Sequence, residues 1–299
     1  MEDQKHLPRR SAMYVPATNQ RAMAKVRSLD CDVIIFDLED AVAPEMKEIA
    51  RRNLVEAFSA TSFPQKETVI RVNSIGTVDF DSDFDVVSQC HPDAVLVPKV
   101  SSAEDFRLLS AAIAEHHIAN STRLWVMIET AAALSNLDRL VATGLASQPK
   151  LDCLVVGTND IAKETGVFPG DQRMLLLPWL MNVILVAKRH GVCVLDGVWN
   201  DFGDQSGFEA EAGQSVKMAF DGKTLIHPCQ VEPSNRWFSP SDSAVMEARG
   251  IATAFAMEEN RGAGVISLNG KMVERLHLVQ AQKLLSLHDA IQTRAQLRR

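Results

Sequence analysis

Two carboxylates stand where short apolar runs of the sequence end. Glu129 closes the run Leu-Trp-Val-Met-Ile, and Asp160 closes the run Leu-Val-Val-Gly-Thr-Asn. Oxygen donors on neighbouring strands can bind a hard divalent cation, and no histidine or cysteine stands beside them, which favours magnesium or manganese over zinc. The alternative is that each carboxylate caps the helix that follows it, a role that fits Asp160 before Ile161. The spacing leaves both interpretations open.

Basic side chains end other runs. Arg71 lies in Val-Ile-Arg-Val-Asn, and its planar guanidinium can hold a substrate carboxylate at two points or form an ion pair with a carboxylate of the protein. Lys99 can contact an anion or pair with Glu39 or Asp40. No lysine is expected in the interior of an apolar strand, so a Schiff-base mechanism is not the first choice. His227, a lone histidine at the end of a run, is interpreted as a hydrogen-bonded structural group.

The elements that must position these groups form a repeating pattern. Eight short runs, most of them rich in Val, Ile and Leu without alternation, indicate strands buried on both faces, as in a parallel sheet. Helical spacing appears between them, at Met46–Phe58, Ala103–His116 and Ala131–Ala142. Eight strand–helix units predict a (β/α)8 TIM barrel, with a doubly wound open sheet as the alternative. The expected strands are Ser11–Pro16, Val33–Asp37, Thr68–Asn73, Ala94–Lys99, Leu124–Thr130, Cys153–Asp160, Val192–Val198 and Lys223–Pro228.

In such a barrel the carboxyl ends of all eight strands meet at one mouth, where active sites lie. Buried charges are costly unless they are paired or bind a metal, so a ring of them at strand ends indicates a functional site. The expected ring, in chain order, is Tyr14, Glu39 with Asp40, Arg71 with Asn73, Lys99, Glu129, Asp160, Asp196 and His227.

The pattern changes after the eighth run. We expect the barrel to occupy residues 1–240 and a C-terminal helical lid or oligomerisation extension to occupy residues 241–299. Within the extension, spacing predicts helices at 242–260 and 271–292, joined by a loop at 261–270 that contains three glycines.

The composition argues against several classes of protein, namely those that bind nucleic acid, zinc or membranes and those built on disulfides. The chain of 299 residues has 46% hydrophobic residues, which is enough for a sizeable core, and a net charge of −7, which argues against nucleic acid as its main partner. Its five cysteines include no Cys-x-x-Cys pair, so neither a zinc site nor a disulfide framework is expected. No apolar run approaches transmembrane length, so no membrane partner is expected and the cytoplasm is the default location.

Several motifs resemble those of the HpcH/HpaI aldolase and citrate lyase beta subunit family, which includes malyl-CoA and citramalyl-CoA lyases. The opening Arg10-Ser-Ala-Met-Tyr-Val-Pro16 is similar to the family's Arg-Ser-x-x-Phe-Val-Pro, and Asp37-Leu-Glu-Asp-Ala-Val42 matches its Asp-Leu-Glu-Asp-Ala-Val. The resemblance spans residues 9 to about 285. The other matching blocks are Arg71-Val-Asn73, Pro98-Lys99, Ile128-Glu129-Thr130, Gly157-Thr-Asn-Asp160, Gly222-Lys223 and Ile226-His227-Pro228 with Gln230.

The resemblance implies roles for particular residues. Glu129 and Asp160 would bind magnesium, and Arg71 would contact the carboxylate or carbonyl of the substrate. Glu39 and Asp40 would order metal-bound waters. The resemblance also assigns Arg10, beside the coenzyme A side of the mouth, and Lys99 to the binding of substrate or coenzyme A.

The C-terminal extension would act as a lid, exchanged between subunits of a homotrimer or hexamer. In malyl-CoA lyases the lid carries a catalytic aspartate within Gly-x-Met-Ile-Asp, whereas this chain has Gly270-Lys-Met-Val-Glu274. Glu274 is therefore the expected acid–base residue. A second departure is Ala17, where the family has glycine after Val-Pro.

The implied reaction is reversible carbon–carbon cleavage of a 3-hydroxy-3-carboxy acyl-CoA, such as malyl-CoA or citramalyl-CoA, into an acyl-CoA and a 2-oxo acid. Three alternatives remain: hydrolysis of the same thioester, a coenzyme A-independent aldolase acting on 2-oxo acids, and a beta subunit of a citrate lyase complex.

Overall fold

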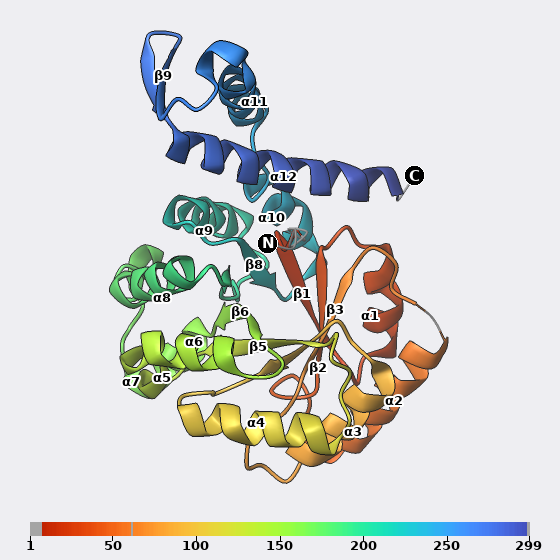
Figure 1. Cartoon of the computed structure of the whole chain (residues 1–299). Coiled ribbons are helices and arrows are strands. Elements are labelled where there is room, and N and C mark those ends of the chain that lie inside the picture. The colour runs from red at the N-terminus through yellow and green to blue at the C-terminus, as the bar shows by residue number, and fades with distance from the viewer. Residues whose placement is uncertain (1–7, 61, 298–299) are drawn as a thin grey trace. The chain divides into compact units, whose positions relative to one another are not determined.

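Eight parallel strands close into a barrel in the computed structural model, which describes residues 8–60 and 62–297 (Figure 1). Each strand pairs with the next along the chain, and β8 pairs back to β1. The predicted (β/α)8 barrel is confirmed. The strands are β1 (Ser11–Pro16), β2 (Val33–Asp37), β3 (Glu67–Arg71), β4 (Ala94–Val97), β5 (Arg123–Ile128), β6 (Leu151–Val156), β7 (Cys193–Asp196) and β8 (Gly222–Leu225).

Helices follow the strands and cover the outside of the barrel (Figure 1). Helical spacing at 46–58 corresponds to α2, and the spacing at 103–116 corresponds to α4, which opens with a capping box between Ser102 and Asp105. The helices of this unit are α1 (Gln20–Lys25), α2 (Lys47–Ala60), α3 (Phe80–Cys90), α4 (Ala103–Glu115), α5 (Ala131–Ser135), α6 (Leu137–Ala146), α7 (Thr158–Thr165), α8 (Leu177–His190), α9 (Gln205–Met218) and α10 (Val231–Trp237).

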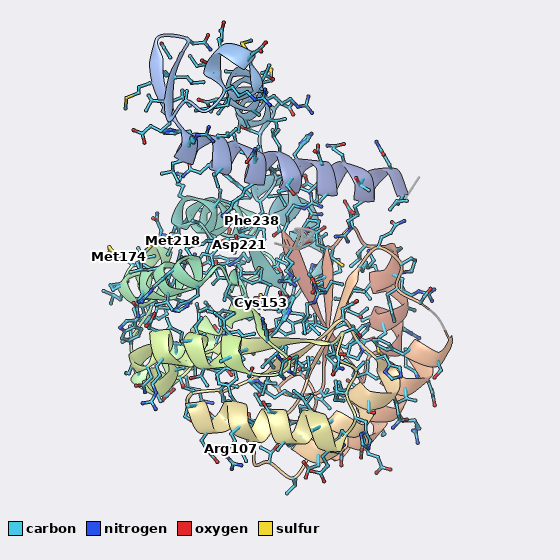
Figure 2. All side chains as sticks on the ribbon, in the orientation of Figure 1. Arg107, Cys153, Met174, Met218, Asp221 and Phe238 are labelled. Atoms are coloured by element: carbon cyan, nitrogen blue, oxygen red, sulfur yellow. The ribbon has the colours of Figure 1, made fainter. Side chains whose placement is uncertain are left out.

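The barrel interior is filled with apolar side chains from alternate strand positions. Trp125 and Met127 of β5 belong to this cluster, and Cys153 of β6, labelled in Figure 2, lies among the strands with them. Close packing of these side chains fixes the strand register, so the residues just beyond each strand reach the mouth at defined positions. The cluster is Ala12, Val33, Ile35, Val69, Ala94, Leu96, Trp125, Met127, Cys153, Val155 and Leu195, with Tyr14 and Cys193 packed against it.

The amino ends of the strands carry a separate ionic cluster. Arg9 forms a bidentate pair with Glu67, with both nitrogen–oxygen distances 2.8 Å, and also contacts Asp152. Arg123 forms a second ion pair with Glu67, at 2.8 Å. The Arg9 guanidinium also lies 4.6 Å from the centre of the Trp125 ring. These contacts connect the first residues of several strands. They lie at the amino-terminal face of the barrel, where residues of such barrels contribute to stability.

The chain from Phe238 onward forms a second compact unit. It contains α11 (Asp242–Ala256), β9 (Val265–Leu268), β10 (Lys271–Glu274) and α12 (Arg275–Leu297). The expectation of a loop at 261–270 and a helix from 271 is therefore wrong in part, because these segments include an antiparallel hairpin. Asn269 and Gly270, at φ 52° and 75°, make its two-residue turn, and this dipeptide favours such turns because both positions need positive φ.

The structure does not describe residues 1–7, 61, 298 and 299. The two expected domains, 1–240 and 241–299, therefore both include residues outside the described part of the chain. Among the helices of the described part, none has the length and apolar character needed to cross a membrane.

Candidate active site

Arg71 is held at the barrel mouth by a carboxylate from the neighbouring strand. It ends β3 and is 8% exposed. Its Nε and NH2 atoms donate to the two oxygens of Asp37, which ends β2, at 2.7 and 2.6 Å. Because two nitrogens are fixed in this way, the orientation of the third, NH1, is fixed as well.

The NH1 nitrogen lies 2.9 Å from Glu39 Oε2 and 3.7 Å from the sulfur of Met127. Glu39 Oε2 has no hydrogen-bond partner among the described residues, so its contact with Arg71 is an ion pair without hydrogen-bond geometry. Arg71 therefore forms the ion pairs that the sequence left as one alternative. Of the three guanidinium nitrogens, only NH1 is not bound to Asp37, so NH1 is the one that could also contact a substrate.

Lys47 holds the turn that carries Glu39 in place through three hydrogen bonds. This buried ammonium donates to the carbonyl oxygens of Leu38 and Glu39 and to Asn73 Oδ1, at 2.7, 2.8 and 2.7 Å. Asn73 also donates to the Leu38 carbonyl at 3.0 Å. The carboxylate of Glu39 is consequently presented by a rigid backbone, and Lys99 Nζ donates to it at 2.8 Å.

Glu129 follows β5 directly and is almost fully buried, with 1% of its surface exposed. The backbone N–H of Lys99 donates to its Oε1 at 2.8 Å, and no cationic side chain forms an ion pair with it among the described residues. Burial raises the pKa of Glu129 to about 8, and the negative charges of Glu39 and Asp160 add to the effect. Glu129 is thus a buried acidic group with which no cationic side chain of the described residues pairs.

Asp160 lies in the first turn of α7 rather than at the end of a strand, because β6 stops at Val156 and Gly157 begins the turn into the helix. Its carboxylate is close enough to influence the pKa of Glu129. No group of three or more His, Cys, Asp or Glu side chains suited to a metal occurs in the described part of the chain. The donor set fits Mg²⁺, which commonly takes one or two carboxylates and fills its other positions with water and substrate.

Gly157 leaves the space that the Glu129 carboxylate occupies. A Cβ atom at residue 157 would lie 2.6 Å from Glu129 Cβ and 2.6 Å from Oε2, too close for either atom to stay in place. The backbone at Gly157 has φ −99°, which other residues adopt, so the requirement for glycine here is steric.

We therefore expect Gly157→Ala to push Glu129 aside and weaken Mg²⁺ binding by about tenfold or more, the scale seen when the surroundings of a metal ligand are disturbed. Titration calorimetry with Mg²⁺ measures this directly. Gly250→Ala is the matched control, because nothing lies within 4 Å of the added Cβ there. Equal Mg²⁺ affinity in both variants would show that Glu129 does not bind the ion.

Arg10 lies at the other end of the barrel from the mouth. It precedes β1, and its Nε and NH2 atoms donate to the two oxygens of Asp32, which precedes β2, at 2.8 and 2.9 Å. The expectation that Arg10 lies beside the coenzyme A side of the mouth is wrong, because the amino ends of parallel strands face away from it. Asp40, in contrast, follows Glu39 at the mouth and is exposed.

Two further groups at strand ends, His227 and Asp196, are bound by other residues of the protein. His227 Nδ1 accepts the backbone N–H of Cys229 at 3.3 Å, and its ring stacks on Phe202 with centroids 4.8 Å apart, in agreement with a structural role. Asp196 is fully buried between Arg173 and Lys223, at 2.6 and 2.9 Å, and these cations lower its pKa against the effect of burial.

Lys223 corrects the expectation that no lysine stands inside a strand. It lies in β8 with none of its surface exposed. Its ammonium is bound by Asp196, by Glu211 at 2.7 Å and by the carbonyl of Gly197 at 2.6 Å. A nitrogen so held is not available as a nucleophile.

Glu274 is the last residue of β10, in the C-terminal unit. Its backbone N–H donates to His277 Nδ1 at 2.9 Å, while Arg275 Nε donates to the Ala263 carbonyl at 2.9 Å. The carboxylate of Glu274 has no ion-pair partner within the described chain, and the neighbouring Arg275 does not pair with it. Its approach to the mouth stays a prediction.

The sequence offered Glu39 as one possible partner of Lys99, and this pair is formed, but the sequence did not assign the groups that hold Arg71, Glu39 and Glu129 in place. Asp37 and Gly157 stand inside the matching blocks and Lys47 lies in the helical segment at 46–58, yet the contacts by which they hold Arg71, Glu129 and Glu39 appear only in the folded chain. For Asp37 the available signal was its place at a strand end next to the strand of Arg71.

Comparison with known proteins identifies the family of this chain. Residues 10–228 match the family described as HpcH/HpaI aldolase/citrate lyase. A protein of Cereibacter sphaeroides (strain KD131 / KCTC 12085) named (3S)-malyl-CoA thioesterase is 40% identical, over 97% of this chain and 98% of that protein. Citrate lyase subunit beta of Leuconostoc mesenteroides subsp. cremoris is 30% identical, over 94% of each chain. Human mitochondrial citramalyl-CoA lyase is 28% identical, over 96% of this chain and 87% of that protein.

A solved structure extends the similarity to the fold. The crystal structure of protein CitE from Mycobacterium tuberculosis in complex with magnesium, acetoacetate and coenzyme A has a TM-score of 0.73 and 25% identity, covering 93% of this chain and 97% of that one. Two of the relatives named above, citrate lyase subunit beta and citramalyl-CoA lyase, are lyases by name. On this sequence and structural evidence, the chain belongs to the HpcH/HpaI aldolase/citrate lyase family of enzymes.

Proposed function

We propose that this enzyme hydrolyses the thioester of a malyl-CoA-type substrate in a Mg²⁺-dependent reaction, releasing the hydroxy acid and coenzyme A. One structural observation carries the metal dependence: the buried Glu129 carboxylate lies near two other carboxylates and has no cationic side chain paired with it in the described chain. The choice of hydrolysis is supported by similarity, because the relatives named thioesterase are 39–40% identical and those named lyase are 28–30% identical.

Within this proposal Glu129 and Asp160 hold Mg²⁺, and manganese would suit the same oxygen donors. The bound cation would supply Lewis-acid polarisation of a substrate oxygen. Glu39 and Asp40 would accept hydrogen bonds from water at the mouth. Lys99, with 43% of its side chain exposed, would offer a positive charge to the substrate or to coenzyme A.

Arg71 would place NH1 against the substrate oxygen that gains negative charge, because its other two nitrogens are held by Asp37. Such a fixed donor lowers the barrier, since it needs no reorganisation when the charge forms. Hydrolysis then requires the addition of water to the thioester carbonyl and the departure of coenzyme A as a thiolate. No proton has to be added to or removed from carbon.

Carbon–carbon cleavage to an acyl-CoA and a 2-oxo acid is the second candidate. The observation that favours it is Glu274, which stands where the resemblance implies the acid–base residue of malyl-CoA lyases and whose carboxylate forms no ion pair with any described residue. Cleavage leaves an enolate that must take up a proton on carbon, so this reaction requires such a group.

The deciding experiment is incubation of the enzyme with malyl-, methylmalyl- and citramalyl-CoA in the presence of Mg²⁺, followed by product analysis. Free hydroxy acid with coenzyme A would support hydrolysis. A 2-oxo acid with a shorter acyl-CoA would contradict it and support cleavage. Chelation of the metal should stop either reaction.

Glu274→Gln separates the two activities. We expect hydrolysis to stay within about threefold of the wild-type rate, while any carbon–carbon cleavage falls by on the order of a hundredfold, the usual contribution of an acid–base group. The ratio of hydroxy acid to oxo acid measures this. Glu259→Gln, in the same unit, is the control for loss of a carboxylate. If hydrolysis falls in step with cleavage, Glu274 takes part in both reactions.

We also propose that the C-terminal unit acts as a lid exchanged between subunits of a homotrimer or hexamer, and that the enzyme works in the cytoplasm. Light scattering after size-exclusion chromatography tests the assembly, and a monomer at working concentration would contradict it.

A further inference from the structure

We propose that the hydroxyl group of Tyr14 is a catalytic hydrogen-bond donor which, together with Arg71, binds the thioester carbonyl oxygen of the substrate. The proposal rests on the thioester chemistry proposed above, and it applies equally to hydrolysis and to carbon–carbon cleavage. In both reactions the same oxygen gains negative charge, either as the adduct of water or as an enolate.

The first step of the argument is the position of Tyr14. It lies in β1 and packs against the apolar cluster inside the barrel, so its side chain points inward. The Arg71 guanidinium lies over the Tyr14 ring, 4.9 Å from its centre. Tyr14 nevertheless keeps some exposed surface. Because its neighbour Arg71 is at the mouth, we infer that this surface is reached from there.

The second step is the state of the hydroxyl. Its one hydrogen-bonding contact within the described residues is the sulfur of Met127, at 4.0 Å. A thioether is a weak acceptor, and this distance is at the limit for one. A phenol placed inside a protein normally finds an oxygen or nitrogen partner, since burial without one costs free energy. A substrate oxygen at the mouth would supply that partner.

The third step is that this hydroxyl keeps its proton. Burial raises the pKa of Tyr14 well above its usual value, the Arg71 charge opposes the rise, and Asp37, Glu129 and Glu39 add to it. The group is therefore a donor at neutral pH. A neutral donor beside a cationic one suits an oxygen that develops negative charge.

Packing alone does not account for the hydroxyl. The family opening to which residues 10–16 are similar has phenylalanine at this position, and a phenylalanine ring would fill the same space and stack equally on Arg71. The hydroxyl is thus an added polar atom that the barrel core does not use.

Tyr14→Phe tests the proposal, because it removes one oxygen and retains the ring. We expect kcat on malyl-CoA to fall by on the order of 10- to 100-fold, the range for a hydrogen bond to a charged group, with little change in KM. The midpoint of thermal unfolding should not change. Thr143→Val, which removes a hydroxyl bonded to the Arg139 carbonyl on α6, is the control and should retain full kcat.

A second measurement does not depend on turnover. Tyr14 is the one tyrosine of the chain, so incorporation of 3-fluorotyrosine gives a single protein fluorine resonance. We expect this resonance to shift when L-malate and Mg²⁺ are added together, because a carboxylate of the acid would occupy the place of the thioester group. L-malate with excess chelator is the comparison sample.

The outcomes are separable. A kcat for Tyr14→Phe within twofold of wild type, or a change confined to KM, would overturn the proposal. If the wild-type enzyme does not act on malyl-CoA at all, the proposed function fails, and the fluorine measurement decides about Tyr14 by itself. A metal-dependent shift would then support contact with the bound acid, and an unmoved resonance would overturn it.

Discussion

Replacement of Glu129 by glutamine is expected to abolish Mg²⁺-dependent turnover and, at the same time, to stabilise the metal-free protein at pH 8. Glutamine has nearly the same shape, and its carbonyl oxygen can still accept the Lys99 backbone N–H that now meets Oε1. It cannot supply the negative charge that a hard divalent cation requires. The variant should therefore fold normally and bind Mg²⁺ poorly.

The stability effect follows from the raised pKa of Glu129, about 8 in the folded protein. The unfolded chain ionises this group near its ordinary value of about 4.3. Between these two values the folded state binds the extra proton, so the wild-type protein loses stability as the pH rises. Glutamine does not ionise and avoids that loss. The difference should be absent near pH 4 and largest at pH 8 and above.

Thermal unfolding in excess chelator measures this at both pH values. We expect the unfolding midpoint of Glu129→Gln at pH 8 to exceed that of wild type by at least about 2 °C, equivalent to roughly 1 kcal/mol. Glu56→Gln, on the exposed surface of α2, is the control and should change neither activity nor stability. Undiminished turnover in Glu129→Gln, or in chelator-treated wild type, would contradict the metal site.

Arg71→Lys is expected to lower kcat/KM by on the order of 100- to 1000-fold, or about 2–4 kcal/mol of transition-state stabilisation. The guanidinium performs two tasks at once, since Nε and NH2 hold Asp37 while NH1 extends towards Glu39 and the mouth. A lysine has one nitrogen and cannot satisfy both sides of this arrangement. If its ammonium pairs with Asp37, the substrate oxygen loses the cationic one of its two proposed donors.

Steady-state kinetics on malyl-CoA measure the loss, and thermal unfolding shows whether the fold is retained. Arg107→Lys is the matched control, because Arg107 lies on the exposed side of α4 and pairs with Glu104 (Figure 2). Near-normal kcat/KM in Arg71→Lys would mean that Arg71 serves only to neutralise Asp37 and Glu39.

The barrel itself could be predicted from the order and composition of the apolar runs. Strands buried on both faces must be apolar throughout, and a parallel strand needs a helix to return the chain, so eight such runs separated by helical spacing leave few architectures. The same logic placed Glu129 and Arg71 at one mouth, because parallel strands end on one side. Strand ends were less well predicted, and Asp160 proved to lie in a helix.

The direction of the strands explains why the expected position of Arg10 was wrong. Arg10 belongs to a family motif, and membership of a motif does not say at which end of a strand a side chain stands. The structure places it before β1, where Asp32 binds it. In the C-terminal unit, the Asn269-Gly270 turn was visible in the sequence, but the short strands beside it have too few residues to show a strand period.

What only tertiary structure decided is which charges meet. Asp37 and Arg71 are 34 residues apart and pair because β2 and β3 are adjacent. Tyr14 of β1 and Arg71 of β3 stand on either side of β2, and they meet because both side chains lie on the inner face of the barrel. Composition and spacing limit which residues can stand at a strand end, whereas the free energy of a buried charge depends on its partners, and these come from strands that are distant in the sequence.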